Sequence, residues 1–349
     1  MIPLAVLGQP PQLSLGLVGG GWRTLDVRQR GATFLALPAR SVINAPAATG
    51  MNFWSLNPYV GCEFGCTYCY ARDTHRYAIE RAGATGALSG AALADVRAMP
   101  AWEAFERRIL VKTDAAALLA RSLDPARLAG QTLVIGTATD PYQPAERRFR
   151  LTRQVLEALL RYRDLSIGII TKSPLITRDL GVLRQLAERH DVHVNISLAT
   201  LDPALARRLE LRSPVPAARL RALARLRQAG IEAGVLIAPI VPALTDGRAA
   251  LGALMAAARR ADARWAIGSP LRLGPAARNR FLPYLAEEFP ELVERYRRRY
   301  GQSDSAGREY QRALERRLDA LQRIHGFAVT EGRRRRRQIE GEAPTTRSG

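Results

Sequence analysis

The 349-residue sequence has only three cysteines and almost no lysine. The cysteines, Cys62, Cys66 and Cys69, lie together in one short stretch, NPYVGCEFGCTYCYAR. An odd number of closely spaced thiols cannot pair completely as disulfides, and free thiols are typical of a reducing compartment. We therefore expect a cytoplasmic protein whose cysteines bind a metal centre.

The sequence also lacks long apolar stretches. None approaches the ~20 consecutive apolar residues that a helix needs to cross a bilayer. The first residues, MIPLAVLGQPPQLSLGLVGGG, contain no basic leader and are interrupted by proline and glycine, so we expect no signal peptide. The apolar fraction of 47% is sufficient for a buried core. These features indicate a globular protein that has no membrane segment.

Acidic residues are too few to balance the basic ones, and the formal net charge is +20. Such a charge favours association with polyanions, including nucleic acids. However, Lys112 and Lys172 are the only lysines among the basic residues, and so strong a preference for arginine also fits a compositional bias. Both interpretations of the charge remain open.

From residue 51 onward, short apolar runs rich in β-branched residues alternate with stretches of helical period. One such stretch, ARLRALARLRQAG, stops at Gly230, as is typical of a helix C-terminus. Buried strands separated by helices predict an α/β fold with a parallel sheet, in six or seven βα units. The predicted strands are 52–59, 109–112, 132–138, 165–171, 192–199, 234–241 and, more weakly, 264–269.

Composition divides the chain into four predicted regions. Residues 1–50 are rich in glycine and proline and are expected to be an irregular extension. Residues 51–270 carry the βα alternation, and residues 271–330 are charged, amphipathic and predicted to be helical. Residues 331–349 include five consecutive arginines and are predicted to be a disordered tail.

The cysteine spacing C-x3-C-x2-C is the most specific motif of the chain. Iron–sulfur clusters are commonly held by four cysteine thiolates, so three ligands would leave one iron open to a small molecule. With Tyr68 before the last cysteine, the motif resembles that of the radical S-adenosylmethionine (SAM) enzymes. The flanking segments NPYVGC and TYCYAR resemble the subgroup of spore photoproduct lyase, often described as DNA repair photolyase-like.

This resemblance implies a partial (β/α)6 TIM-like barrel. It also implies that Cys62, Cys66 and Cys69 hold a [4Fe-4S] cluster whose open iron binds SAM. One-electron reduction, by a flavodoxin- or ferredoxin-like protein, would then cleave SAM to a 5'-deoxyadenosyl radical that abstracts hydrogen from a substrate. The substrate and the oligomeric state are not implied.

The candidate site residues lie at predicted strand ends, where barrel-like α/β folds place their active sites. The segment GTATDPYQPAE, at the end of the predicted strand 132–138, resembles a feature of the photolyase-like subgroup. Most radical SAM proteins have a Gly-Gly-Glu-like stretch after the second strand, and this stretch is missing after Lys112. The GTATD stretch is the candidate to replace it. The predicted catalytic residues are Asp140, Tyr142 and Lys172, and the predicted cofactor contacts are Tyr68, Thr139, Ser197 and Pro239.

Other interpretations of the cysteines stay open. Zinc could bind the three thiolates together with His75, or the cysteines could be buried and inert. Spore photoproduct lyases use a further cysteine as a hydrogen donor, and no cysteine remains here for that role. A mechanism of that kind would require Tyr70 or Tyr142 as the donor instead. The alternatives for the whole protein are an enzyme that repairs or modifies nucleic acid, and a nucleic-acid-binding protein with a structural metal site.

Overall fold

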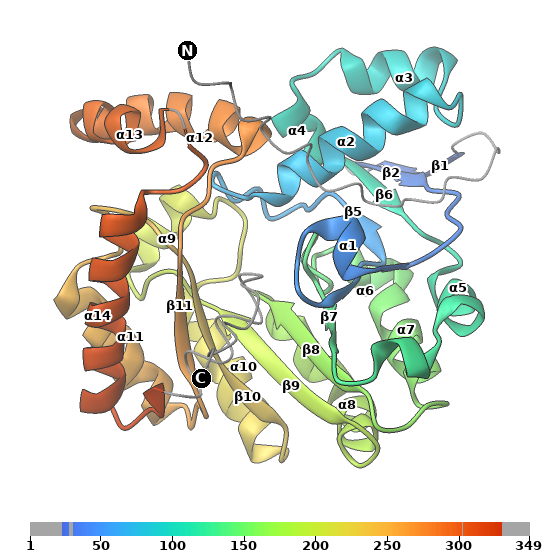
Figure 1. Cartoon of the computed structure of the whole chain (residues 1–349). Coiled ribbons are helices and arrows are strands. Elements are labelled where there is room, and N and C mark those ends of the chain that lie inside the picture. The colour runs from blue at the N-terminus through green and yellow to red at the C-terminus, as the bar shows by residue number, and fades with distance from the viewer. Residues whose placement is uncertain (1–22, 28–30, 302, 330–349) are drawn as a thin grey trace, which may run out of the picture.

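The computed structural model describes residues 23–27, 31–301 and 303–329. Its centre is a seven-stranded sheet in the order β11-β10-β9-β8-β7-β4-β3 (Figure 1). The strands from β4 to β11 in this order run parallel to their neighbours, and β3 at the edge is antiparallel. The bounds are β3 Ile43–Asn44, β4 Trp54–Leu56, β7 Thr132–Ile135, β8 Ser166–Thr171, β9 Asp191–Ser197, β10 Glu232–Ile240 and β11 Ala266–Pro270.

Helices cover one face of this sheet, with α7, α8, α10 and α11 behind the strands in Figure 1. Alternate strand residues such as Ile135, Ile169 and Val194 are fully buried in the main core on this side. The helices are α1 Pro46–Thr49, α2 Ala71–Ala84, α3 Gly90–Arg97, α4 Ala101–Arg107, α5 Ala115–Ser122, α6 Glu146–Phe149, α7 Leu151–Leu159, α8 Leu180–Ala187, α9 Pro203–Leu209, α10 Pro216–Gln228, α11 Arg248–Arg260, α12 Pro275–Glu288, α13 Val293–Tyr300 and α14 Arg308–Ile324. Three 3₁₀ turns are η1 Pro125–Leu128, η2 Pro174–Asp179 and η3 Pro290–Leu292.

A parallel sheet with helices on one face and a concave opposite face is the predicted α/β architecture. The βα alternation of the sequence dictates it, because parallel strands need crossover connections that return the chain to the same edge. The partial barrel and its six parallel strands are therefore confirmed.

Residues 109–112 do not belong to this barrel, and their prediction as its second strand is wrong. They form β6 (Arg108–Val111) of a separate four-stranded sheet, in the order β1-β2-β6-β5. In that sheet β6 pairs with β2 (Thr33–Ala36) and with β5 (Tyr59–Val60). An apolar run of this length predicts a buried strand but does not specify the sheet to which the strand belongs. As a result, β7 is the second parallel strand of the barrel.

The N-terminal region also differs from its prediction as irregular. Within residues 1–50 the structure places β1 (Arg23–Val27), β2 and β3. Strands β1 and β2 pair with each other, and β3 adds to the barrel edge beside β4. These strands are too short to show a period in the sequence. Their pairing with other strands, and not local propensity, fixes them.

Helices α12, α13 and α14 lie in the region predicted to be helical. Leu314, Leu318 and Leu321 of α14 belong to the main core, where α14 packs against α11 and β11. Because Gly268 of β11 has no side chain, the Leu318 side chain can approach its backbone closely. The C-terminal helix thus completes the packing of the last barrel strand. The tail predicted over residues 331–349 lies outside the described residues.

Candidate active site

The three cysteines lie on the loop between β5 and α2, near the carboxyl ends of the barrel strands. Cys62 and Cys66 are each 7% exposed, and Cys69 is partly buried. Two glycines give this loop its path: Gly61 and Gly65 both have positive φ, of 94° and 63°. A Cβ at Gly61 would lie 2.9 Å from the Phe105 carbonyl oxygen, so a side chain there would collide with α4.

Backbone hydrogen bonds fasten the cysteine loop to two other segments. The Cys62 amide donates to the Phe105 carbonyl at 3.0 Å. The Thr67 amide donates to Leu209 at 2.9 Å, and the Arg212 amide donates to the Phe64 carbonyl at 3.0 Å. The loop is therefore held by α4 and by the segment that follows α9.

The side chains of Thr139 and Gln143 support the loop from the barrel side. Both donate to the Gly61 carbonyl, at 2.6 and 3.1 Å, and the Glu63 amide donates to Gln143 at 3.0 Å. The Glu63 carboxylate in turn accepts from the Ala145 amide at 2.7 Å. Thr139, a predicted cofactor contact, therefore uses its hydroxyl to position the cysteine loop.

Asp140 connects the ends of β7 and β8. Its carboxylate accepts hydrogen bonds from the Thr171 hydroxyl at 2.7 Å, the Lys172 amide at 2.7 Å and the Tyr142 amide at 2.9 Å. Burial raises the pKa of Asp140, and these three donors oppose that shift. A carboxylate with three local donors fixes the backbone at Lys172. The structure thus brings the predicted catalytic residue Asp140 to the site in a positioning role.

Lys172 and Ser197 meet at the ends of β8 and β9. The Lys172 ammonium donates to the Ser197 hydroxyl at 2.9 Å and lies 3.7 Å from the Glu210 carboxylate. Ser197 donates onward to the Ala238 carbonyl at 3.1 Å, next to Pro239. Burial alone would lower the pKa of Lys172, but the Glu210 carboxylate raises it above its ordinary value. Lys172 therefore stays protonated near neutral pH.

Tyr68 faces the same group of residues. Its hydroxyl donates to Glu210, and its ring centroid lies 6.0 Å from the Lys172 ammonium. Burial would raise the pKa of Glu210, but Arg219 and Lys172 outweigh burial and lower it. The sequence contains no motif that marks Glu210 or Arg219 as site residues, although both are buried charged side chains in the site.

Tyr142 and Tyr70 occupy different environments. Tyr142 is 1% exposed within the main core, where burial and the Asp179 carboxylate raise its pKa. The structure does not bring Tyr142 to the cysteines as a catalytic residue. Tyr70 is 47% exposed and donates to the Thr137 carbonyl at 2.6 Å. Tyr70 is thus the accessible one of the two tyrosines considered as hydrogen donors.

The thiols sit among groups that suit an anionic iron–sulfur centre. Burial raises the pKa of Cys62, Cys66 and Cys69, that of Cys66 to about 12. The Lys172 ammonium opposes this shift at Cys66, and the Arg72 guanidinium opposes it at Cys69. Three soft thiolates with nearby cations are the donor set that a [4Fe-4S] cluster prefers. The residues present therefore fit the cluster.

The same residues do not fit the zinc alternative. His75, the proposed fourth zinc ligand, is fully buried, bonds to the Arg108 carbonyl at 2.8 Å and packs on the Phe105 ring. Among the described residues, no three or more His, Cys, Asp or Glu side chains are grouped to hold a metal ion.

We expect His75 to make the protein sensitive to acid. Burial lowers its pKa from 6.5 to about 4, so its folded form resists protonation more than its unfolded form. Above pH 6.5 the imidazole is neutral in both states and costs the folded protein nothing. As the pH falls toward 4, the unfolded form takes up the proton more readily, so the free energy of unfolding decreases by up to about 3 kcal/mol. Urea unfolding of the wild type and of His75→Gln at several pH values measures this difference. An equal pH dependence of the two proteins would contradict it.

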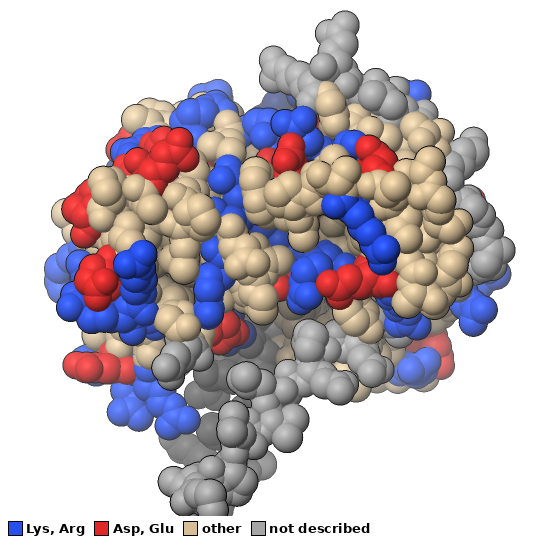
Figure 2. Space-filling view, turned by 90° about the horizontal axis from the view of Figure 1, so that it is seen from above, with Lys and Arg blue, Asp and Glu red and all other residues tan. Residues whose placement is uncertain are grey.

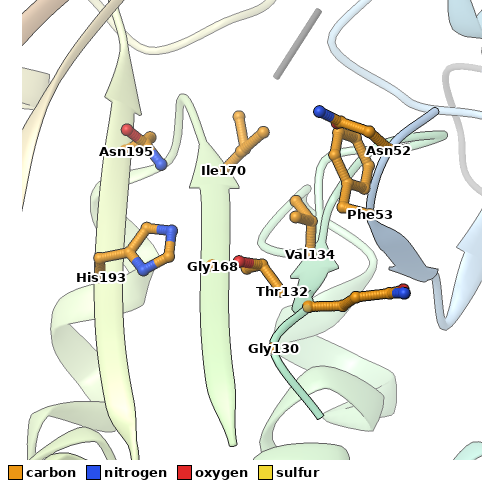
Figure 3. Close-up of a pocket in the computed structure, with 10 residues that line it drawn as sticks. Asn52, Phe53, Gly130, Thr132, Val134, Gly168, Ile170, His193 and Asn195 are labelled. Atoms are coloured by element: carbon orange, nitrogen blue, oxygen red, sulfur yellow. The ribbon is translucent and has the colours of Figure 1, made fainter. Parts of the chain in front are cut away.

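A cavity of about 210 Å³ lies on the concave face of the barrel sheet (Figure 3). His193 and Asn195 point into it from β9, and Ile170 points into it from β8. Because side chains alternate along a strand, Ser197 and Lys172 continue these two rows toward the cysteine loop. The cavity wall is completed by Asn52, Phe53, Gly130, Gln131, Thr132, Val134 and Gly168.

This geometry defines an α/β partial barrel with a three-cysteine loop near the carboxyl ends of its strands and a polar cavity in its interior. The chain matches the Radical SAM superfamily over residues 56–251 and belongs to that family. Membership implies a [4Fe-4S] cluster and SAM as cofactors, and enzymes of this family generally require an electron donor.

The chain is also similar to individual curated proteins. An uncharacterised protein of Mycobacterium tuberculosis is 33% identical over 293 residues, which cover 83% of this chain and 80% of that protein. An uncharacterised protein of Methanocaldococcus jannaschii is 26% identical over 212 residues, or 61% of this chain and 69% of that protein.

The fold is also similar to solved structures of spore photoproduct lyase. A variant with bound AdoMet and dinucleoside spore photoproduct aligns with a TM-score of 0.53 at 15% identity. The alignment covers 78% of this chain and 74% of that chain. At this identity the similarity shows the shared fold. In the described part of this chain, no helix is long and apolar enough to cross a membrane.

Proposed function

We propose that this protein cleaves SAM reductively and uses the resulting radical to abstract hydrogen from a substrate bound in the barrel. The observation that carries this proposal is the three-cysteine loop beside the Lys172–Ser197 pair, at the carboxyl ends of the strands. When bound, the cluster would supply the electron that splits SAM into methionine and a 5'-deoxyadenosyl radical. The roles of the surrounding residues follow from their contacts.

Cys62, Cys66 and Cys69 would hold the cluster, and Lys172 with Ser197 would bind the methionine carboxylate of SAM. The support is chemical: a protonated lysine beside a hydroxyl forms charge-assisted hydrogen bonds to a carboxylate. The backbone of the GTATD turn would accept hydrogen bonds from the SAM ammonium. This role is supported by the position of the turn, which follows the second parallel strand of the barrel.

The cavity lined by His193 and Asn195 is the proposed substrate site. Its wall combines amide, imidazole and hydroxyl groups with the Phe53 ring, which suits a polar substrate with a flat apolar face. Trp265 donates to Asn195 at 2.9 Å, so the amide is held in one orientation. We also propose a flavodoxin- or ferredoxin-like reductant, because the net charge of +20 complements an acidic protein partner.

SAM cleavage tests the proposal. Anaerobically reconstituted protein should release 5'-deoxyadenosine when dithionite and SAM are added together, and release none when either is omitted. A well-folded sample with iron bound that releases no 5'-deoxyadenosine would contradict the proposed reaction.

Repair or modification of a nucleic acid is a second candidate function, and one basic cavity favours it. Arg295, Arg298 and Arg299 line a hollow of about 470 Å³ next to Ala306 and Gly307. Arg299 stacks on the Tyr310 ring at 4.5 Å to its centroid, and Arg295 and Arg298 are exposed, so a phosphate could reach their guanidinium groups. Elsewhere, basic side chains are spread over the face seen in Figure 2, with acidic ones between them.

We expect this cavity to contribute to nucleic-acid binding if nucleic acid is the substrate. Replacing Arg295 and Arg298 together by alanine should weaken DNA or RNA binding and reduce the slope of log K against log salt by about 1 to 2. Fluorescence anisotropy at several salt concentrations measures both. Replacing Arg259 and Arg260 at the end of α11 provides a control of equal charge. If the control variant lost the same affinity for nucleic acid, the net charge of the protein, and not this cavity, would account for binding.

A further inference from the structure

A buried carboxylate, Glu210, links the cysteine loop to the lysine at the strand ends. Glu210 is 2% exposed and follows α9 directly. One carboxylate oxygen accepts from the Tyr68 hydroxyl and lies 3.7 Å from the Lys172 ammonium, and the other accepts from Arg219. Both oxygens of the carboxylate therefore have partners inside the site.

Arg219 is as rigidly placed as the carboxylate. It is 1% exposed, on α10. Its guanidinium donates to the Pro214 carbonyl at 2.8 Å, to the Ser197 carbonyl at 3.1 Å and to Glu210. A planar guanidinium with acceptors on several sides has little freedom to move. Glu210 is thus anchored to β9 through Arg219, while its other oxygen faces Lys172.

The charges in this group do not balance. Lys172 and Arg219 provide two positive charges, and Glu210 provides one negative charge, all at the buried end of β9. Within these three residues one positive charge is therefore in excess where the flexible lysine side chain ends, and the Cys66 and Cys69 sulfurs face the same charge. A ligand carboxylate beside Lys172 would neutralise this excess, which is the arrangement that a buried charged site requires.

We propose that Glu210 is a positioning residue for SAM binding, which holds the Lys172 ammonium and the Tyr68 side chain in place beside the proposed methionine site. This inference rests on the proposed contact between Lys172 and the SAM carboxylate. Without the Glu210 carboxylate, Lys172 would lose the partner that keeps its four-carbon chain in one conformation. It would also face the unneutralised charge of Arg219.

A double-mutant cycle tests whether Glu210 acts through Lys172. SAM affinity is measured by equilibrium dialysis on reconstituted protein with the cluster oxidised, so that no turnover occurs. Glu210→Gln and Lys172→Met should each raise the Kd of SAM by about 10-fold or more, as the loss of a charged hydrogen bond does. The double variant should bind no more weakly than Lys172→Met alone. An unchanged Kd in Glu210→Gln, or fully additive losses, would overturn the inference.

A second variant separates positioning from stability. In Glu210→Gln the buried Arg219 charge is left without its partner, so the apo-protein should unfold at a lower temperature. Adding Arg219→Gln removes that charge and should restore much of the melting temperature, while the SAM Kd stays high. If SAM affinity returned together with stability, Glu210 would have only a structural role. If the wild type with bound iron failed to bind SAM, the proposed function itself would fail, which is a separate result.

Discussion

Replacing Cys66 by alanine should abolish iron loading and SAM cleavage. Cys66 is one of only three cysteines in the chain, so no other thiol can take its place. Loss of residues that merely support metal ligands already costs 10- to 100-fold in many metal sites, so loss of a ligand should exceed about 100-fold. Anaerobic reconstitution followed by iron analysis and quantification of 5'-deoxyadenosine measures both effects.

The apo-protein provides the control for this substitution. The Cys66 thiol makes a weak hydrogen bond with the Ser213 hydroxyl at 3.4 Å and packs in a buried cluster, so its removal should change the stability of the apo-protein by only about 1 kcal/mol. Ser213→Ala removes the same contact and keeps all three thiols. It should retain iron. Full iron loading of Cys66→Ala would show that the cluster is bound elsewhere or in another way.

Replacing Glu106 by glutamine should destabilise the protein and loosen the cysteine loop. Glu106 is 6% exposed and pairs with the fully buried Arg72 at 2.7 Å and with Arg212 at 2.5 Å. Arg72 also donates to the Cys66 carbonyl at 2.7 Å, and Arg212 donates to the Glu63 carbonyl at 2.6 Å. Removing the carboxylate leaves Arg72 as a buried charge without its partner. Such changes cost about 3 kcal/mol.

Urea unfolding of the apo-protein measures the loss of stability, and the rate of iron release to a chelator measures the loosening of the loop. Glu103→Gln on the same helix is the matched control. Glu103 forms an exposed ion pair with Arg107 at 2.9 Å, which should be worth less than about 1 kcal/mol. If Glu106→Gln released iron no faster than Glu103→Gln, the buried pair would not hold the loop.

Local patterns in the sequence were sufficient to predict the α/β fold and the cysteine loop, and the resemblance of the cysteine motif added the partial barrel. The strands β7, β8 and β10 appear as short runs rich in apolar residues, because most of their side chains are buried, and β9 alternates apolar with polar residues. Lys172 and Ser197 could be identified for the same reason, since each comes at the end of such a run. The motif C-x3-C-x2-C specifies its own ligands within one loop, and this required no knowledge of the tertiary structure.

Contacts between distant segments were not predictable in this way. The apolar run at β6 looks like any buried strand, and only its pairing with β2 and β5 removes it from the barrel. Glu210 and Arg219 lie in LELRSPVPAARL, an arginine-rich stretch that resembles a solvated surface. Their burial depends on packing against Tyr68, which is 142 residues away from Glu210 in sequence. A single sequence contains no local signal for that contact.

The central claim is that three thiols of one loop hold a four-iron cluster with one iron open to SAM. Its most direct test is iron analysis combined with electron paramagnetic resonance of the reduced cluster, with and without SAM. We predict about four irons per chain, as cysteine-held [4Fe-4S] clusters contain, and a signal that changes shape when SAM is added. A single bound zinc, or an iron signal that SAM leaves unchanged, would contradict the account.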